Sequence, residues 1–188
     1  MSPDLATIDL LRHGDTGRRS YRGQIDDPLS ALGWSQVRAA VEQRTCDRVV
    51  SSPLQRCAAF ARELAVLRGV PLVLDVRLAE YHFGDWQGVP IETLAANDAG
   101  ALQRFWADPL AYPPPGSEGM PAFRSRVCAA LDDIAASVGS ARVLVVTHGG
   151  VIRMLRCVVE DRPLRDMAGI EVPHASLHRI AWRVRETA

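Results

Sequence analysis

Lysine is absent from this sequence of 188 residues, and all 22 basic residues are arginines. The absence excludes P-loop and Schiff-base mechanisms, because both depend on a lysine side chain. No apolar run approaches the roughly 20 residues that cross a bilayer, so we expect no membrane partner. The first seven residues lack the basic and apolar regions of a signal peptide, and we therefore expect a cytoplasmic protein.

Cysteines and metal-binding patterns are also sparse. The four cysteines show no CxxC spacing, which favours buried, reduced thiols over disulfides. No H-x-H or H-E-x-x-H pattern occurs, so we expect neither a metal site nor a cofactor. The 22 acidic residues balance the 22 basic ones, and a net charge of zero gives no case for a nucleic-acid partner.

The length and the apolar content of 47% fit a single domain over residues 1–188. Apolar runs typical of strands alternate with helical patterns, which predicts an α/β fold. We expect a three-layer sandwich, with a mostly parallel central sheet flanked by helices. The predicted strands are 7–11, 48–51, 71–76, 142–147 and 176–184. The strand at 142–147 is the most apolar and is expected at the centre of the sheet. The strand at 176–184 is expected to run antiparallel at an edge.

The predicted helices follow these strands, apart from one irregular segment. Ser30 is a candidate N-cap for the first helix, and Ser52 with Pro53 has the pattern that opens the second. Residues 79–121 include three consecutive prolines and read as a cap or lid insertion, with 113–121 as a stiff loop. The predicted helices cover 31–44, a stretch beginning at 53, one or two between 91 and 107, 122–138 and 149–159.

Four polar segments are predicted to meet at the carboxyl edge of the sheet, where ligands bind in open α/β folds. They carry Arg12 and His13, Arg56, Glu80, and His148. Two of the segments also begin helices, whose free N–H groups attract anions. Because two guanidinium groups match the oxygens of a phosphoryl group, a histidine nucleophile and a carboxylic acid beside them indicate phosphoryl transfer.

These segments, in this order, resemble the histidine phosphatase superfamily, also called phosphoglycerate-mutase-like, over nearly the whole chain. The resemblance implies a phosphoglycerate-mutase-like fold and no metal or cofactor. It implies that His13 becomes phosphorylated and that Glu80 is the proton donor. It also implies that Arg12, Arg56 and His148 hold the phosphate, with His148 cationic beside the dianion. A small phosphorylated substrate is the only partner that it implies, and the oligomeric state stays open.

Within the superfamily, the chain resembles the bacterial α-ribazole-5′-phosphate phosphatases of cobalamin assembly. The resemblance rests on the segments at 23–30, 51–58, 80–88, 105–109 and 112–116. It implies α-ribazole 5′-phosphate as the substrate. The alternatives are a broad-specificity phosphatase or a phosphoglycerate mutase on the same scaffold, and a non-enzymatic module that binds a phosphorylated ligand. Mutases usually carry longer insertions than 188 residues allow.

Some positions depart from the family pattern. Asp15 stands where glutamate or glutamine is commoner, and Arg19 stands where many relatives have an asparagine that touches the phosphate. The arginine-rich loop at 16–23 either closes over an anionic substrate or is a solvated loop. A substrate contact by Glu118 also stays open. The other histidines (His82, His174 and His178) are predicted to be structural or exposed, and among the tryptophans Trp86 is the candidate for the pocket wall.

Overall fold

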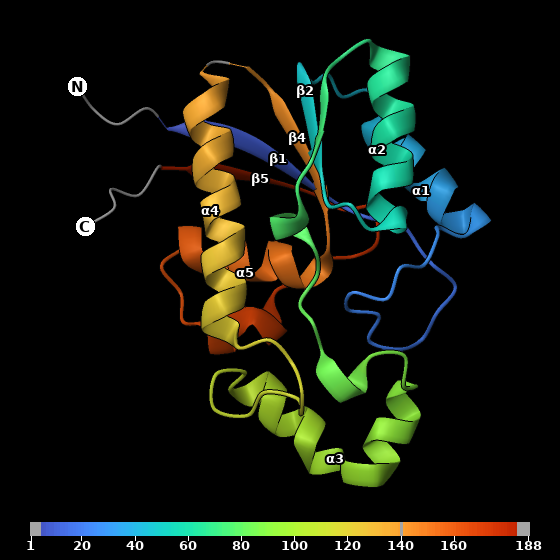
Figure 1. The fold of residues 1–188 in the computed structure, drawn as a ribbon, viewed down its shortest axis with the longest axis vertical. Coiled ribbons are helices and arrows are strands. Elements are labelled where there is room, and N and C mark those ends of the chain that lie inside the picture. The colour runs from blue at the N-terminus through green and yellow to red at the C-terminus, as the bar shows by residue number, and fades with distance from the viewer. Residues whose placement is uncertain (1–4, 140, 184–188) are drawn as a thin grey trace.

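The computed structural model describes residues 5–139 and 141–183 (Figure 1). Helices and strands alternate through most of this part of the chain. The strands are β1 (Ala6–Arg12), β2 (Arg48–Ser51), β3 (Leu72–Leu74), β4 (Val143–Thr147) and β5 (Leu177–Trp182). The α-helices are α1 (Ala31–Val41), α2 (Gln55–Arg68), α3 (Ile91–Ala107), α4 (Met120–Val138) and α5 (Gly149–Val159). Short 3₁₀ turns are η1 (Val76–Leu78), η2 (Gly84–Trp86) and η3 (Leu164–Gly169).

The five strands form one sheet in the order β3-β2-β4-β1-β5. The first four are mutually parallel, and β5 runs antiparallel to β1 at the edge. Every residue of β4 is buried, as expected for the central strand of a parallel sheet. The mostly parallel sheet with an antiparallel edge strand is therefore confirmed, although the end of the last predicted strand, residue 184, lies outside the described residues.

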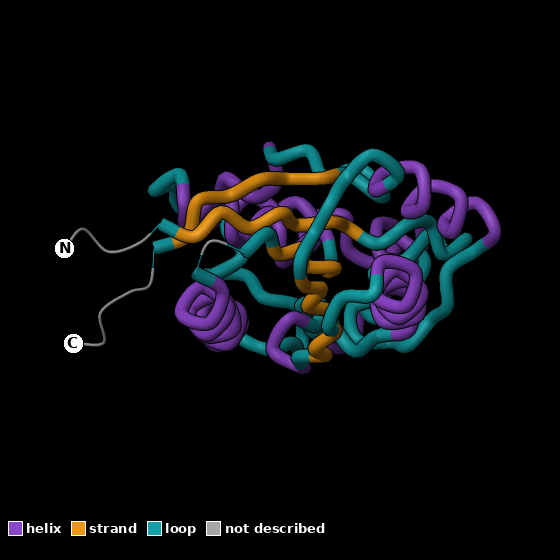
Figure 2. The backbone as a smooth tube through the Cα atoms, turned by 90° about the horizontal axis from the view of Figure 1, so that it is seen from above, coloured by secondary structure: helices purple, strands orange, loops and turns teal. Residues whose placement is uncertain are grey.

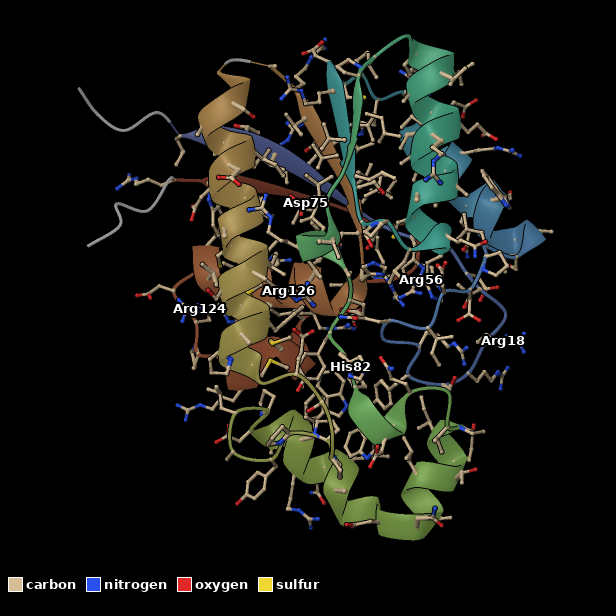
Figure 3. All side chains as sticks on the ribbon, viewed as in Figure 1. Arg18, Arg56, Asp75, His82, Arg124 and Arg126 are labelled. Atoms are coloured by element: carbon tan, nitrogen blue, oxygen red, sulfur yellow. The ribbon has the colours of Figure 1, made fainter. Side chains whose placement is uncertain are left out.

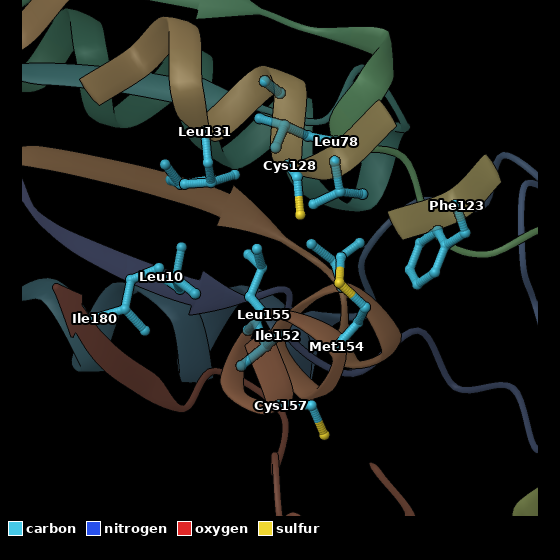
Figure 4. Close-up of a cluster of buried hydrophobic side chains, with 14 of the residues drawn as sticks. Leu10, Leu78, Phe123, Cys128, Leu131, Ile152, Met154, Leu155, Cys157 and Ile180 are labelled. Carbon is cyan, nitrogen blue, oxygen red and sulfur yellow. The ribbon is translucent and has the colours of Figure 1, made fainter. Parts of the chain in front are cut away.

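Helices cover both faces of this sheet and give three layers (Figures 1 and 2). Successive residues of β4 point to opposite faces: Val145 belongs to the core under α4 and α5, and Val146 to the core under α1 and α2. Figure 4 shows part of the first core, where Leu131 and Leu155 pack against the sheet. The predicted three-layer sandwich is confirmed.

Helix boundaries test the capping predictions. The Ser30 hydroxyl accepts a hydrogen bond from the Gly33 N–H at 3.0 Å, so the predicted N-cap of α1 is confirmed. The predicted start of α2 is wrong, because this helix begins at Gln55 and its N-cap residue is Leu54. The Ser52 hydroxyl lies instead 2.7 Å from a ring nitrogen of His148. His148, at the start of α5, thus provides the shorter contact, because the Leu54 N–H donates to the same hydroxyl only at 3.4 Å.

The segment at 79–121 lies beyond the carboxyl edge of the sheet, where Figure 1 shows α3. Its helix kinks at Asp98, which has non-helical φ and ψ angles, in agreement with the one or two helices predicted. The segment is joined to the loop that follows β1 by a bridge between Ser20 and Pro90 and by the Gly88 N–H, which donates to the Tyr21 carbonyl at 2.9 Å. The predicted loop at 113–121 ends sooner, because α4 begins at Met120.

Among the described residues, no helix combines the length and apolar content that a bilayer crossing requires.

Candidate active site

His13 lies just past the end of β1, where the parallel register pairs Arg12 with Thr147 of β4. Its backbone N–H donates to the Thr147 carbonyl at 3.0 Å, and only 7% of the residue is exposed. The ring Nδ1 lies 2.7 Å from the Gly14 carbonyl oxygen. A carbonyl can only accept, so Nδ1 carries the proton and Nε2 keeps its lone pair. Burial, followed by the nearby Arg56, lowers the pKa of His13 well below 6.5, which keeps the imidazole neutral.

Two arginines lie beside this imidazole. The Arg12 Nη1 donates to the Val172 carbonyl at 2.6 Å, whereas its buried Nε has no hydrogen-bond partner among the described residues. Burial lowers the pKa of Arg12 to about 10, so the guanidinium still carries its charge at neutral pH. A charged group with an unused buried donor is suited to an anion in the adjoining pocket.

Arg56, in the first turn of α2, is only 1% exposed (Figure 3). Its Nη1 donates to the Ile25 carbonyl at 2.7 Å and its Nη2 to the Gly23 carbonyl at 2.5 Å. Its Nε donates to His148 Nδ1 at 3.3 Å. The guanidinium therefore ties the loop after β1 to the helix and still lines the pocket with its remaining donor capacity.

His148 precedes α5 and is fully buried. Its ring lies edge-on to that of His13, with 5.3 Å between the centroids. Because the Arg56 N–H can only donate, Nδ1 of His148 must hold a lone pair, and Nε2–H then donates to the Ser52 hydroxyl. Burial and then Arg56 lower its pKa well below 6.5. The ring is therefore neutral in this geometry, because burial and the neighbouring guanidinium disfavour the charged form. A cationic His148 beside a bound dianion stays a prediction.

Glu80 follows η1 and projects toward the start of α5. Its Oε1 accepts from the Tyr81 N–H at 2.9 Å and its Oε2 from the Gly150 N–H at 3.0 Å. A Cβ atom at position 150 would lie 2.4 Å from Glu80 Oε1, so a larger residue there would displace this carboxyl group. Both oxygens are thus fixed by backbone donors, and the carboxyl group lines the same pocket as Arg12 and His13.

Arg126 of α4 supports the loop segment that carries Glu80 (Figure 3). It donates to the backbone carbonyls of Arg77, Ala79 and Glu80 at 2.7–3.0 Å. It also pairs with Glu118, at 2.6 Å between Nη2 and Oε1. The open question about Glu118 therefore has a structural answer: this carboxylate holds Arg126 and does not line the pocket.

These groups surround a pocket of about 260 Å³ at the carboxyl edge of the sheet. Of the five site residues predicted from the sequence, Arg12, His13, Arg56 and Glu80 line it, whereas His148 lies behind them. Three aromatic residues, Tyr21, Phe83 and Trp106, close one side of the pocket and are called the aromatic wall. The rings of Tyr21 and Phe83 are stacked, with 4.6 Å between their centroids. The Trp106 Nε1–H donates to the Tyr21 hydroxyl at 2.7 Å.

The structure adds residues that the sequence did not single out. Trp106 lines the pocket, while Trp86, the predicted wall residue, is buried behind it. His174 was predicted to be structural or exposed, but it lines the pocket beside His13. Arg153 lines it as well. Its spacing of four residues from Gly149, on the same face of α5, is the signal that could have identified it.

No cluster of three or more potential metal ligands occurs in residues 5–139 and 141–183. Cys46, Cys57 and Cys157 are free thiols, and burial raises the pKa of the Cys57 thiol to about 12, so this neighbour of His148 stays protonated.

Comparison with known families decides the classification. The profile of the histidine phosphatase superfamily (branch 1) matches residues 8–188. The chain belongs to the histidine phosphatase superfamily. As a member of this family with phosphatase relatives, it is a phosphoric monoester hydrolase that acts on small phosphorylated substrates.

Several relatives within this superfamily are informative. Glucosyl-3-phosphoglycerate phosphatase of Mycobacterium tuberculosis is 30% identical over an alignment 204 positions long. This alignment covers 93% of this chain and 91% of that protein. The native structure of the mycobacterial glucosyl-3-phosphoglycerate phosphatase matches with a TM-score of 0.83, covering 92% of this chain and 88% of the other. The alpha-ribazole phosphatase structure from Shigella flexneri matches with a TM-score of 0.79 at 26% identity, covering 93% and 89%.

Another relative is longer. A bifunctional protein of Mycobacterium tuberculosis is 37% identical over 153 residues, which cover 78% of this chain but only 42% of that protein. This chain therefore corresponds to less than half the length of that relative.

Proposed function

We propose that this histidine phosphatase hydrolyses phosphomonoesters through a phosphohistidine at His13. The observation that carries the proposal is the 2.7 Å contact between His13 Nδ1 and the Gly14 carbonyl. It leaves the Nε2 lone pair for attack on phosphorus, and the depressed pKa keeps that nitrogen unprotonated. Arg12 and Arg56 would neutralise the phosphoryl oxygens, whose charge is the main barrier to the reaction.

Glu80 is proposed as the proton carrier. In the first step His13 Nε2 bonds to phosphorus, the ester P–O bond breaks, and protonated Glu80 gives its proton to the leaving oxygen. In the second step Glu80 takes a proton from water as that water displaces His13 from phosphorus. His148 belongs to the same proposed phosphate-binding set, because it packs against His13 and accepts a hydrogen bond from Arg56.

Trapping the intermediate tests this proposal. Enzyme quenched during turnover should carry phosphate in an acid-labile, alkali-stable linkage, and His13→Ala should lose both the label and turnover. His178→Asn is a control, because that histidine lies on β5 and does not line the pocket. An acid-stable linkage on a serine would contradict the assignment. Return of the labelled phosphoryl group to an acceptor alcohol instead of water would identify a mutase.

For the alcohol half of the substrate, we propose α-ribazole 5′-phosphate, which would place the enzyme in cobalamin biosynthesis. The aromatic wall of Tyr21, Phe83 and Trp106 supports this choice, because stacked rings bind a flat heterocycle. The likeness to the alpha-ribazole phosphatase of Shigella flexneri supports it as well. The proposed cap at 79–121 supplies two residues of this wall, Phe83 and Trp106.

A second candidate is a phosphorylated hydroxy acid such as glucosyl-3-phosphoglycerate. Arg18, Arg19 and Arg153 line the pocket, and none of them has an ion-pair partner in the described parts of the chain. These cations favour a substrate with a carboxylate besides its phosphate. Comparison of kcat/KM for α-ribazole 5′-phosphate, glucosyl-3-phosphoglycerate and p-nitrophenyl phosphate decides between them. Similar values for all three would identify a broad-specificity phosphatase.

A further inference from the structure

His174 is an imidazole on the pocket wall that the mechanism above does not use. Its ring centroid lies 5.8 Å from that of His13, with 43° between the ring planes. The residue is half-buried, and neither of its ring nitrogens forms a hydrogen bond with any residue that the structure describes. A half-buried ring with two unused polar atoms beside a nucleophile is a candidate ligand contact.

The backbone around His174 is held against the tip of β1. Arg12 N donates to the Ser176 carbonyl at 3.1 Å, Ala175 N donates to the His13 carbonyl at 3.2 Å, and Arg12 Nη1 donates to the Val172 carbonyl at 2.6 Å. Ala175 has a φ of 58°, a conformation that residues with a Cβ rarely adopt. The three contacts maintain this unusual turn, and the turn places His174 beside the nucleophile.

We propose that His174 is a further phosphate-binding residue, which takes up a proton when the phosphoryl dianion enters and donates a hydrogen bond to one of its oxygens. The inference rests on the proposed function, because it assumes that the phosphoryl group lies at His13. His148 is buried behind the pocket as a neutral ring, so His174 is the imidazole that borders the pocket next to His13.

The charges around His174 fit a proton uptake that accompanies phosphate binding. Burial and then Arg12 lower its pKa, whereas Asp15 across the loop raises it, and the neighbouring titratable ring is the neutral His13. The imidazole is therefore neutral before the anion binds. A dianion at a few ångströms reverses the balance and favours the imidazolium, so phosphate affinity and proton uptake are linked.

Calorimetry with inorganic phosphate tests the proposal without requiring turnover. His174→Asn should weaken phosphate binding about 10- to 100-fold near pH 6, since a charge-assisted hydrogen bond is lost. Titration in two buffers of different ionisation enthalpy measures how many protons are taken up on phosphate binding. This number should be lower in His174→Asn than in the wild type, by up to one proton. His178→Asn is the matched control, because it removes an imidazole from the same end of the chain outside the pocket, and it should bind phosphate as the wild type does.

Imidazole NMR of the unmodified protein gives a second readout that does not depend on how the variant folds. Phosphate should raise the pKa of His174 by at least about one unit. An unchanged pKa, or equal phosphate affinity and proton uptake in His174→Asn and wild type, would overturn the inference. The trapping experiment separates the two proposals: a phosphohistidine at His13 without these effects refutes only the role of His174, whereas no phosphohistidine refutes the proposed function.

Discussion

Replacement of Glu80 by glutamine separates a proton carrier from a structural carboxylate. In the wild type each carboxylate oxygen accepts one backbone N–H, from Tyr81 at 2.9 Å and from Gly150 at 3.0 Å. Glutamine has one oxygen and one NH₂ group, so one of these N–H donors would face another donor. The lost charge-assisted hydrogen bond contributes about 1.5–3 kcal/mol, and its loss affects every substrate equally.

The loss of the proton is not equal for all substrates. An alkoxide such as a ribose 5′-oxygen leaves poorly without protonation, so Glu80→Gln should slow phosphohistidine formation from an alkyl ester by a further 10²–10⁴-fold, roughly. The p-nitrophenolate anion is stable, and phosphohistidine formation from its ester should show only the common loss. Rapid quenching of the first turnover measures this step, whereas steady-state rates would mix it with hydrolysis of the intermediate.

Glu118→Gln provides the matched control, because it makes the same chemical change in a carboxylate that pairs with Arg126 outside the pocket. Its effect should not depend on the leaving group. Equal losses with both esters in Glu80→Gln would refute the proton-transfer role, and the acid would then have to be sought elsewhere.

The remaining predictions concern the glycine at 150, the buried imidazole and metal ions. Gly150→Ala should reduce turnover of alkyl esters at least tenfold, roughly, because its Cβ would lie 2.4 Å from Glu80 Oε1; Gly169→Ala, which meets nothing within 4 Å, should be neutral in the same assay. The depressed pKa of His148 means that the unfolded chain binds more protons below pH 6.5. The stability that this group contributes is present above that pH and is lost as the pH falls. The melting temperature of His148→Gln should therefore fall less with acidification than that of the wild type. Parallel curves of melting temperature against pH would contradict the buried neutral state. Dialysis against a chelator should leave turnover unchanged, since Arg12 and Arg56 supply the charge that Mg²⁺ supplies in other phosphatases; a loss restored by Mg²⁺ would argue against this mechanism.

Local pattern accounted for the layers and for most of the site. Apolar runs and 3.6-residue periodicity placed the strands and helices, because burial of β4 on both faces requires an unbroken apolar run such as Val143–Val146. The Arg-His-Gly segment and the segment carrying Arg56 each follow a predicted strand, and parallel strands bring their carboxyl ends to one edge. Glu80 follows no predicted strand end, and only the family resemblance indicated its role. Four of the five predicted site residues line one pocket.

Contacts between distant segments decided the rest. Ser52 reads as a helix cap, yet its hydroxyl faces His148, 96 positions away. Arg126 belongs to no motif in the sequence, yet it donates to the backbone carbonyls of Arg77, Ala79 and Glu80. His174 follows no motif and reaches the pocket only because its turn is bonded to β1. Propensity and periodicity act over a few residues, whereas the state and surroundings of each catalytic group depend on which buried donors and charges the folded chain brings beside it.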